Sequence, residues 1–209
     1  MTRLRRLFGE IPMPWWKVLV LAVAAGAYTA LTCLVPGVAQ TSLHDIAVMP
    51  DAWVLLAVFI IVNCRRWWEA ALKCFVFFLI SQPLVYLIQV PFATLGWGIF
   101  MYYPRWGIIT LLTLPGAAVA FLVKRRDWIS VAVLSVADAL LAALAVTYCG
   151  MMVRGFPFHL LSMLFCVAVI ALFIAVLLDK PAHRLTAAGL AVAATAVTVA
   201  LTGLRGLNY

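Results

Sequence analysis

The chain has 209 residues, of which 67% are hydrophobic and 11% are charged, and its mean hydropathy is +1.13. Soluble domains carry about a quarter charged residues, so this composition excludes an ordinary soluble domain. The net charge of +8 comes from basic residues at the ends of apolar runs, where they face anionic lipid headgroups, so we expect the lipid bilayer and not nucleic acid as the partner.

Seven apolar runs follow one another along the chain. Because a membrane-spanning helix needs about 20 apolar residues, these runs predict an all-α, polytopic integral membrane helical bundle that forms a single transmembrane domain over residues 1–209. The predicted spans are residues 15–36, 51–64, 67–90, 106–123, 128–149, 159–178 and 185–204.

The first two runs each allow another interpretation. The first could be a cleaved signal peptide with a small-residue site near Ala39, which would leave six spans. Its apolar stretch is longer than the roughly 7–15 residues usual for such a signal, so a retained anchor is favoured. The second run is short, and it crosses only if flanking residues contribute or the bilayer thins locally.

The basic residues alternate between the two sides of these spans. Three of the fifteen lie on one side, and these are Arg105, Arg154 and Arg205. The other twelve are Arg3, Arg5, Arg6, Lys17, Arg65, Arg66, Lys73, Lys124, Arg125, Arg126, Lys180 and Arg184. By the positive-inside rule, this asymmetry predicts a multi-pass protein of the cell membrane with a cytoplasmic N-terminus and an external C-terminus.

The loop after the first span carries capping signals. Ser42 followed by Asp45 is typical of a capping box and predicts a short interfacial helix, and Asp51 is expected to be the N-cap of the second span. A metal site is the alternative for His44, Asp45, Asp51 and His159. Since capping already accounts for both aspartates, and the five cysteines have no metal-binding spacing, we expect no metal and no other cofactor.

Two spans carry rows of small residues that favour close helix contact. In the first span the row is Ala22, Gly26 and Ala30. In the seventh it is Gly189, Ala193, Ala196 and Gly203. Either row could pack inside the bundle, which is the commoner use, or dock a partner membrane subunit.

Asp138 is an acidic residue in the middle of the fifth span. It lies twelve residues after Arg126, or about 18 Å into the membrane at about 1.5 Å per residue. Ser135, Ala142, Ala145 and Cys149 share its helical face, so we expect the carboxyl group to point into the bundle. It is then either a functional proton, cation or solute-binding group or a protonated hydrogen-bonding link between helices.

Lys73 is a cation inside the third span. Glu69 precedes it by four residues, the favourable order for an intrahelical ion pair. One interpretation is therefore a snorkelling lysine near a charged helix start. The alternative is an ion pair with Asp138, which requires the third and fifth spans to touch.

The outer half of the third span is polar on one face. Gln82, Tyr86 and Gln89 are spaced at i, i+4 and i+7, and Pro83 interrupts the helical hydrogen bonding beside them. The fourth span has a similar interruption at mid-depth, which consists of Thr110, Thr113, Pro115 and Gly116. Transporters use such breaks to bind substrate, although a purely structural kink is the alternative.

The sequence therefore favours a small-solute or ion transporter, or the membrane subunit of a transport complex. The alternatives are an enzyme acting on lipid or a lipid-linked substrate and a non-catalytic accessory subunit. No nucleophile or metalloprotease motif is present, so we assign no catalytic residue and favour a non-enzymatic role. The candidate substrate- or ion-binding residues are Asp138, Gln82, Tyr86, Gln89, Lys73, Thr113 and Ser135.

Overall fold

The computed structural model describes residues 6–154 and 157–206; in this part of the chain it has no strands, and 84% of the protein is helical. Six helical segments are long and apolar enough to span a membrane: residues 15–34, 67–89, 96–125, 128–153, 160–177 and 181–202. The described chain divides into two compact units, one of residues 6–121 and one that contains the described residues from Leu122 onward.

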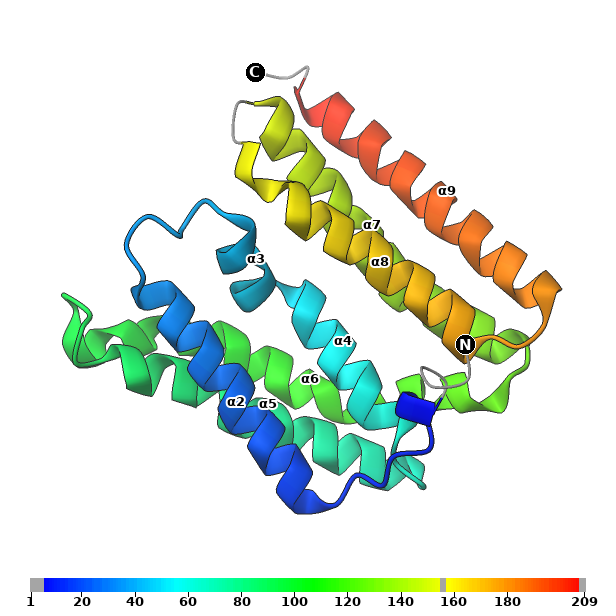
Figure 1. Ribbon diagram of the computed structural model, residues 1–209, viewed down its shortest axis with the longest axis horizontal. Coiled ribbons are helices and arrows are strands. Elements are labelled where there is room, and N and C mark those ends of the chain that lie inside the picture. Colours follow the sequence, from blue (N-terminus) through cyan, green and yellow to red (C-terminus); the bar gives the residue numbers. More distant parts are fainter. Residues whose placement is uncertain (1–5, 155–156, 207–209) are drawn as a thin grey trace. The chain divides into compact units, whose positions relative to one another are not determined.

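Five α-helices and one 3-10 segment have described bounds in the first unit (Figure 1). The elements are α2 (Trp15–Leu34), α3 (Ser42–Val48), α4 (Pro50–Val62), α5 (Trp67–Gln89), η1 (Gly96–Tyr102) and α6 (Tyr103–Ala120). The 3-10 segment η2 (Phe121–Arg125) continues α6, so the fourth predicted span is helical from Gly96 and is longer than expected.

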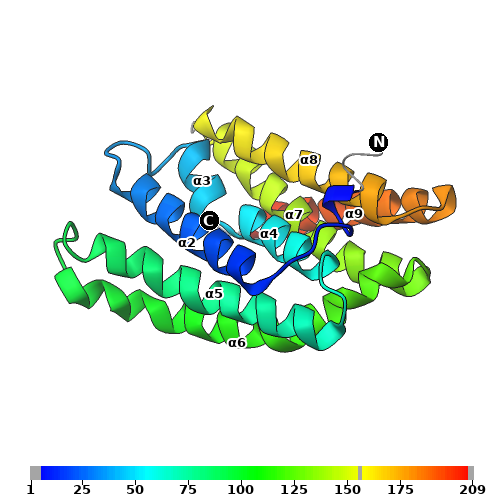
Figure 2. The same cartoon turned by 60° about the horizontal axis from the view of Figure 1, so that its bottom comes forward.

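The helices α2 and α5 are parallel neighbours, and α5 lies between α2 and α6 (Figure 2). Two contacts fix the direction. The Lys73 ammonium group near the start of α5 donates a hydrogen bond to the carbonyl of Met13, just before α2. Asn63, at the end of α4, accepts hydrogen bonds from the amides of Gly9 and Ile11 at 3.0 Å each. The chain therefore returns through α3 and α4 before α5 begins.

A bend of 46° separates α3 from α4. Its cause is Pro50, which occupies the first turn of α4 and holds Met49 in an extended conformation (φ −78°, ψ 162°). The short helix predicted after the first span is confirmed, but both predicted caps are wrong by one or two positions. The N-caps are Thr41 and Met49, so Ser42 and Asp51 lie inside the first turns instead.

The small-residue row of α2 packs against α5. Ala22 and Ala30 are fully buried, and a Cβ atom built on Gly26 would lie 2.7 Å from the carbonyl oxygen of Ser81. Only a glycine permits this approach, because any side chain there would collide with backbone. Beside this contact, the rings of Trp53, Phe77 and Phe78 form the aromatic part of the core.

The second unit contains α7 (Trp128–Val153), η3 (Pro157–His159), α8 (Leu160–Leu177) and α9 (Pro181–Gly206). Helix α7 packs against both other long helices (Figure 1). Its buried face includes Val131, Leu134, Asp138, Leu141, Ala142 and Tyr148. The expected face was rotated from this one, since Cys149 is exposed and Ser135 is only half-buried.

In contrast to α7, which has a long buried face, α9 exposes most of its side chains. Ala187 and Ala191 face inward, whereas Gly189, Ala193 and Ala196 of the predicted small-residue row are exposed. The side chains of Gly203 and Arg205 lie outside the described part, as do Arg3 and Arg5 of the basic N-terminal group.

Candidate functional site

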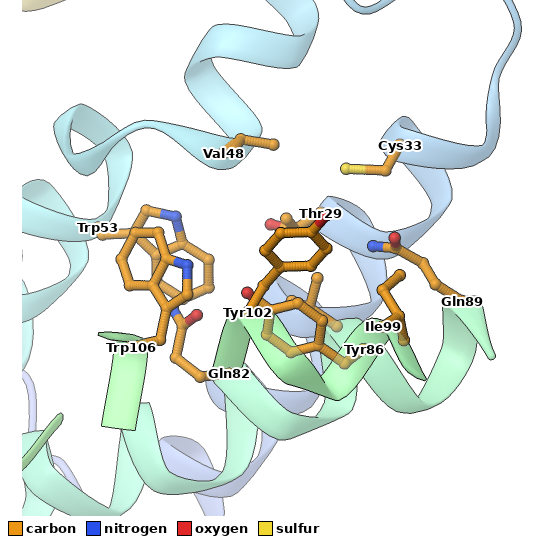
Figure 3. Close-up of a pocket in the computed structure, with 11 residues that line it drawn as sticks. Thr29, Cys33, Val48, Trp53, Gln82, Tyr86, Gln89, Ile99, Tyr102 and Trp106 are labelled. Atoms are coloured by element: carbon orange, nitrogen blue, oxygen red, sulfur yellow. The ribbon is translucent and has the colours of Figure 1, made fainter. Parts of the chain in front are cut away.

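A pocket of about 330 Å³ lies inside the first unit (Figure 3). It is formed where the C-terminal halves of α2 and α5 meet the α3–α4 break and the η1–α6 segment. The lining residues are Thr29, Cys33, Val48, Trp53, Gln82, Val85, Tyr86, Gln89, Ile99, Tyr102 and Trp106. None of these eleven described residues carries a charge.

The polar face predicted on α5 lines this pocket. Gln82, Tyr86 and Gln89 all belong to the lining, and Gln82 is the deepest of the three at 4% exposure. Figure 3 shows Gln82 beside Trp53 and Trp106, whereas Gln89 lies beside Cys33 on the opposite side. The i, i+4, i+7 spacing brings all three residues to one face because about 3.6 residues make a helical turn.

The other elements contribute residues that sequence reasoning did not select. Thr29 and Cys33 come from α2, Trp53 from α4, and Tyr102 and Trp106 from the η1–α6 segment. The expected topology could have identified these residues. In an up-and-down bundle, the end of α2, the start of α4, the end of α5 and the start of α6 lie at the same end.

One fully buried donor in the lining has no hydrogen-bond partner among the described residues. The Thr29 hydroxyl and the Trp53 indole both donate to the carbonyl of Ala47, at 2.9 and 3.1 Å. The side-chain nitrogen of Gln82 is buried and has no hydrogen-bond partner within the described residues. Leaving such a group unpaired costs about 1–3 kcal/mol, so a solute whose acceptor bonds to this amide would be stabilised.

An aromatic cluster packs around Tyr86 of the pocket lining. The ring of Tyr86 lies 5.8 Å from that of Phe100 and 6.1 Å from that of Tyr103, and Trp97 stacks on Phe100 at 5.9 Å. Gly96 begins this segment with a φ of +51°, a conformation that other residues rarely adopt. The 3-10 turn therefore places rings, and not backbone, against Tyr86.

Lys73 is remote from the pocket. Its ammonium group pairs with Glu69 and the carbonyl of Met13, and it lies 5.4 Å from the ring centroid of Trp15. The predicted i,i+4 pair with Glu69 is thus confirmed, but the lysine is 4% exposed, so it is buried and does not snorkel into solvent. Its role is to join the N-terminal segment to α5.

Two further candidates bond within their own helices. The Thr113 hydroxyl donates to the carbonyl of Thr110 at 2.6 Å, and the Ser135 hydroxyl donates to that of Val131 at 2.8 Å. Neither residue belongs to the pocket lining. The hydroxyl of Thr110, by contrast, is buried without a hydrogen-bond partner among the residues described.

Asp138 belongs to the second unit and is fully buried on α7. The expectation that it points into the helix bundle is confirmed. Both of its carboxyl oxygens lack a hydrogen-bond partner in the part of the chain that the structure describes. The simple hydrogen-bonding link between helices is therefore not formed by any described residue.

No group of three or more His, Cys, Asp or Glu side chains able to hold a metal ion occurs in the described ranges. No protein-family model, curated protein or solved structure matches the chain. Any function must therefore be argued from the pocket and from Asp138.

Proposed function

We propose that the protein is a small-solute transporter, or the membrane subunit of a transport complex, that binds its solute in the pocket of the first unit. The observation that carries this proposal is the pocket of about 330 Å³ with the unpaired amide of Gln82 in its wall. Concave sites of roughly 300–1,000 Å³ with a few placed polar groups are typical of small-molecule binding.

We also propose seven spans, with α3 and α4 together forming one broken span. Because α2 and α5 are parallel, the chain between them has to cross back. The two helices contain 7 and 13 residues, which at about 1.5 Å per residue make about 30 Å, the thickness of the hydrocarbon core. Val48 and Trp53 flank the break and line the pocket, as broken helices do in many transporters.

The orientation proposed places the N-terminus in the cytoplasm and the pocket toward the outside of the cell membrane. Lys17, Arg65 and Arg66 are at the end of the first unit where α2 and α5 begin. The pocket is lined from the opposite ends of those helices. By the positive-inside rule the basic end is cytoplasmic, so the pocket belongs to the outer half.

Asp138 is proposed as the group that binds a proton or cation during transport. A carboxyl group at mid-membrane costs about 2.5–3.5 kcal/mol on insertion scales, so its retention without a described partner favours a functional role. A membrane enzyme receives less support. An enzyme acting on a lipid phosphate would need an acid such as Glu69 close to a phosphate-binding cation such as Arg105. These two residues lie at opposite ends of the α5–α6 hairpin, about 30 Å apart along its axis.

A partner subunit would bind to the exposed face of α9. The small residues of α2 are already packed against α5, whereas Gly189, Ala193 and Ala196 on α9 are exposed. The accessory role therefore remains the second candidate, as one component of a transport complex.

Cysteine labelling tests the orientation. In intact cells, a membrane-impermeant methanethiosulfonate added outside should modify Leu95→Cys and native Cys33, in a background with Cys149→Ser. Arg65→Cys should react only in inverted vesicles. Labelling of Arg65→Cys from outside, with Leu95→Cys protected, would contradict the proposed topology.

Uptake into proteoliposomes tests transport. Nicotinamide, 1-methylnicotinamide and nicotinate provide one ring framework in uncharged, cationic and anionic forms. We expect at least one to enter faster than into protein-free vesicles under an imposed proton gradient, and Asp138→Asn to lower that rate. Initial rates equal to those of protein-free vesicles for all three would overturn the transport function.

A further inference from the structure

The pocket lining limits the charge of any solute it holds. The eleven lining residues include no Asp, Glu, Lys, Arg or His. An ion buried without a paired charge loses its hydration without compensation, a cost far larger than one hydrogen bond recovers. The chemistry of the lining therefore favours an uncharged solute.

The hydrogen-bonding pattern specifies what the solute offers. The Thr29 hydroxyl and the Trp53 indole N–H each donate a hydrogen bond to the carbonyl of Ala47. Gln82 retains a buried N–H donor with no partner among residues 6–154 and 157–206. Its complement is an acceptor, such as a carbonyl oxygen or a ring nitrogen.

The shape of the pocket indicates a ring. Trp53 and Trp106 lie on the same side as Gln82, and Tyr102 and Tyr86 lie between them and Gln89 (Figure 3). Aromatic rings gain additional stabilisation from offset or edge-to-face contact with another ring. The volume of about 330 Å³ is at the small end of ligand pockets, so it suits one or two fused rings.

We propose that the pocket binds an uncharged heterocycle whose carbonyl or ring-nitrogen acceptor meets the side-chain amide of Gln82 while its ring packs against Trp53 and Trp106. This assignment deepens the proposed transport function, on which it rests, by naming the solute class. An organic cation held against the ring faces is the competing outcome.

Cys33 provides a native reporter for occupancy of the pocket. It lines the pocket and is half-buried, whereas Cys64, Cys74 and Cys166 are buried. Cys149 is exposed, so replacing it with serine leaves Cys33 as the accessible thiol. The rate at which methyl methanethiosulfonate modifies Cys33 in nanodiscs, followed by intact mass spectrometry, then measures whether the pocket is filled.

The three pyridine probes compare charge at nearly constant shape. In ~10 mM nicotinamide, a Kd of about 1 mM would slow modification of Cys33 about tenfold. We expect 1-methylnicotinamide and nicotinate to give less than half of that protection. Stronger protection by either ion, or no protection by any of the three, would overturn the assignment.

Gln82→Leu tests the acceptor contact, because leucine keeps similar bulk and removes the donor. One lost hydrogen bond of about 0.5–1.5 kcal/mol should raise the nicotinamide Kd about two- to thirteenfold. Gln40→Leu makes the same chemical change at an exposed loop position and should leave the Kd unchanged. If Cys33 of the Gln82→Leu variant reacts at the original rate without probe, the variant pocket is intact. An unaltered nicotinamide Kd in this intact pocket would contradict the role of Gln82.

The two proposals fail separately. Protection of Cys33 by nicotinamide without uptake would remove the transport function and leave the solute class standing. Uptake of only a charged probe would remove the solute class and leave transport standing.

Discussion

Gly26 of α2 lies against the backbone of Ser81 in α5, so closely that a methyl group at Gly26 would approach the Ser81 carbonyl oxygen to 2.7 Å. Ser81 directly precedes Gln82, which lines the pocket. The pocket and the helix contact are therefore parts of the same structure.

Gly26→Ala should separate the two helices and lower the free energy of unfolding by about 1–3 kcal/mol, as overpacked cores do, despite alanine's better helix propensity. The measurement is unfolding in mixed micelles with increasing SDS. Gly116→Ala is the matched control, because no described heavy atom lies within 4 Å of its Cβ, and it should be neutral or stabilising. Equal effects of the two variants would contradict the close contact.

Glu69 and Lys73 should behave as a coupled pair in a double-mutant cycle. Glu69→Gln leaves the buried Lys73 charge without its counter-ion and should cost about 3–5 kcal/mol. Lys73→Met removes that charge and should cost less, since the lost hydrogen bonds are worth about 1–3 kcal/mol. The double variant should be more stable than Glu69→Gln alone, and additive losses would exclude the pairing.

Asn63 should hold the N-terminal segment on the end of α4. Its oxygen accepts from Gly9 and Ile11, and its nitrogen donates to the carbonyls of Leu7 and Phe59. Asn63→Ala should therefore accelerate hydrogen exchange at the Gly9 and Ile11 amides about tenfold, the equivalent of about 1.4 kcal/mol.

The control for this experiment is Asn63→Asp, which keeps the acceptor and loses the donor. Exchange at Gly9 and Ile11 should remain slow in this variant, while the contact with Leu7 weakens. Equally fast exchange in both variants would mean that the two amides are protected by something other than the Asn63 oxygen.

Asp138→Leu should leave stability unchanged or raise it, because the carboxyl oxygens have no described partner to lose. Leu141→Ala, one turn further along the same buried face, should lower the free energy of unfolding by about 2–5 kcal/mol. Thermal unfolding in detergent compares the two. A loss for Asp138→Leu as large as that for Leu141→Ala would identify Asp138 as a structural hydrogen-bonding residue instead.

The helical segments could be predicted from the chain because each depends on residues near one another in sequence. Predicted residues 15–36, 67–90 and 128–149 correspond to Trp15–Leu34, Trp67–Gln89 and Trp128–Val153. Errors occurred where a local pattern had competing solutions. The N-cap positions are Thr41 and Met49 instead of Ser42 and Asp51, and at α4 the cause is Pro50, which occupies the first turn.

Sequence spacing also identified three of the eleven residues that line the pocket. Periodicity is enough to place Gln82, Tyr86 and Gln89 on one face, since a helix imposes the same geometry wherever it lies. It does not reveal what that face meets. Thr29, Trp53 and Trp106 come from three other helices, and they converge only because Gly26 allows α2 to approach α5 and the α3–α4 break turns Trp53 toward Gln82.

Membrane class, helix periodicity and charge asymmetry can be predicted from the sequence alone. The length of each apolar run and the positions of Lys and Arg are set by the bilayer and do not depend on the tertiary fold. Which polar groups are paired depends on packing. Lys73 is neutralised by Glu69, whereas Gln82 keeps an unpaired donor and Asp138 two unpaired oxygens among the described residues. A hydrogen bond requires two atoms within about 3 Å, and for residues far apart in the chain only the folded structure establishes that distance.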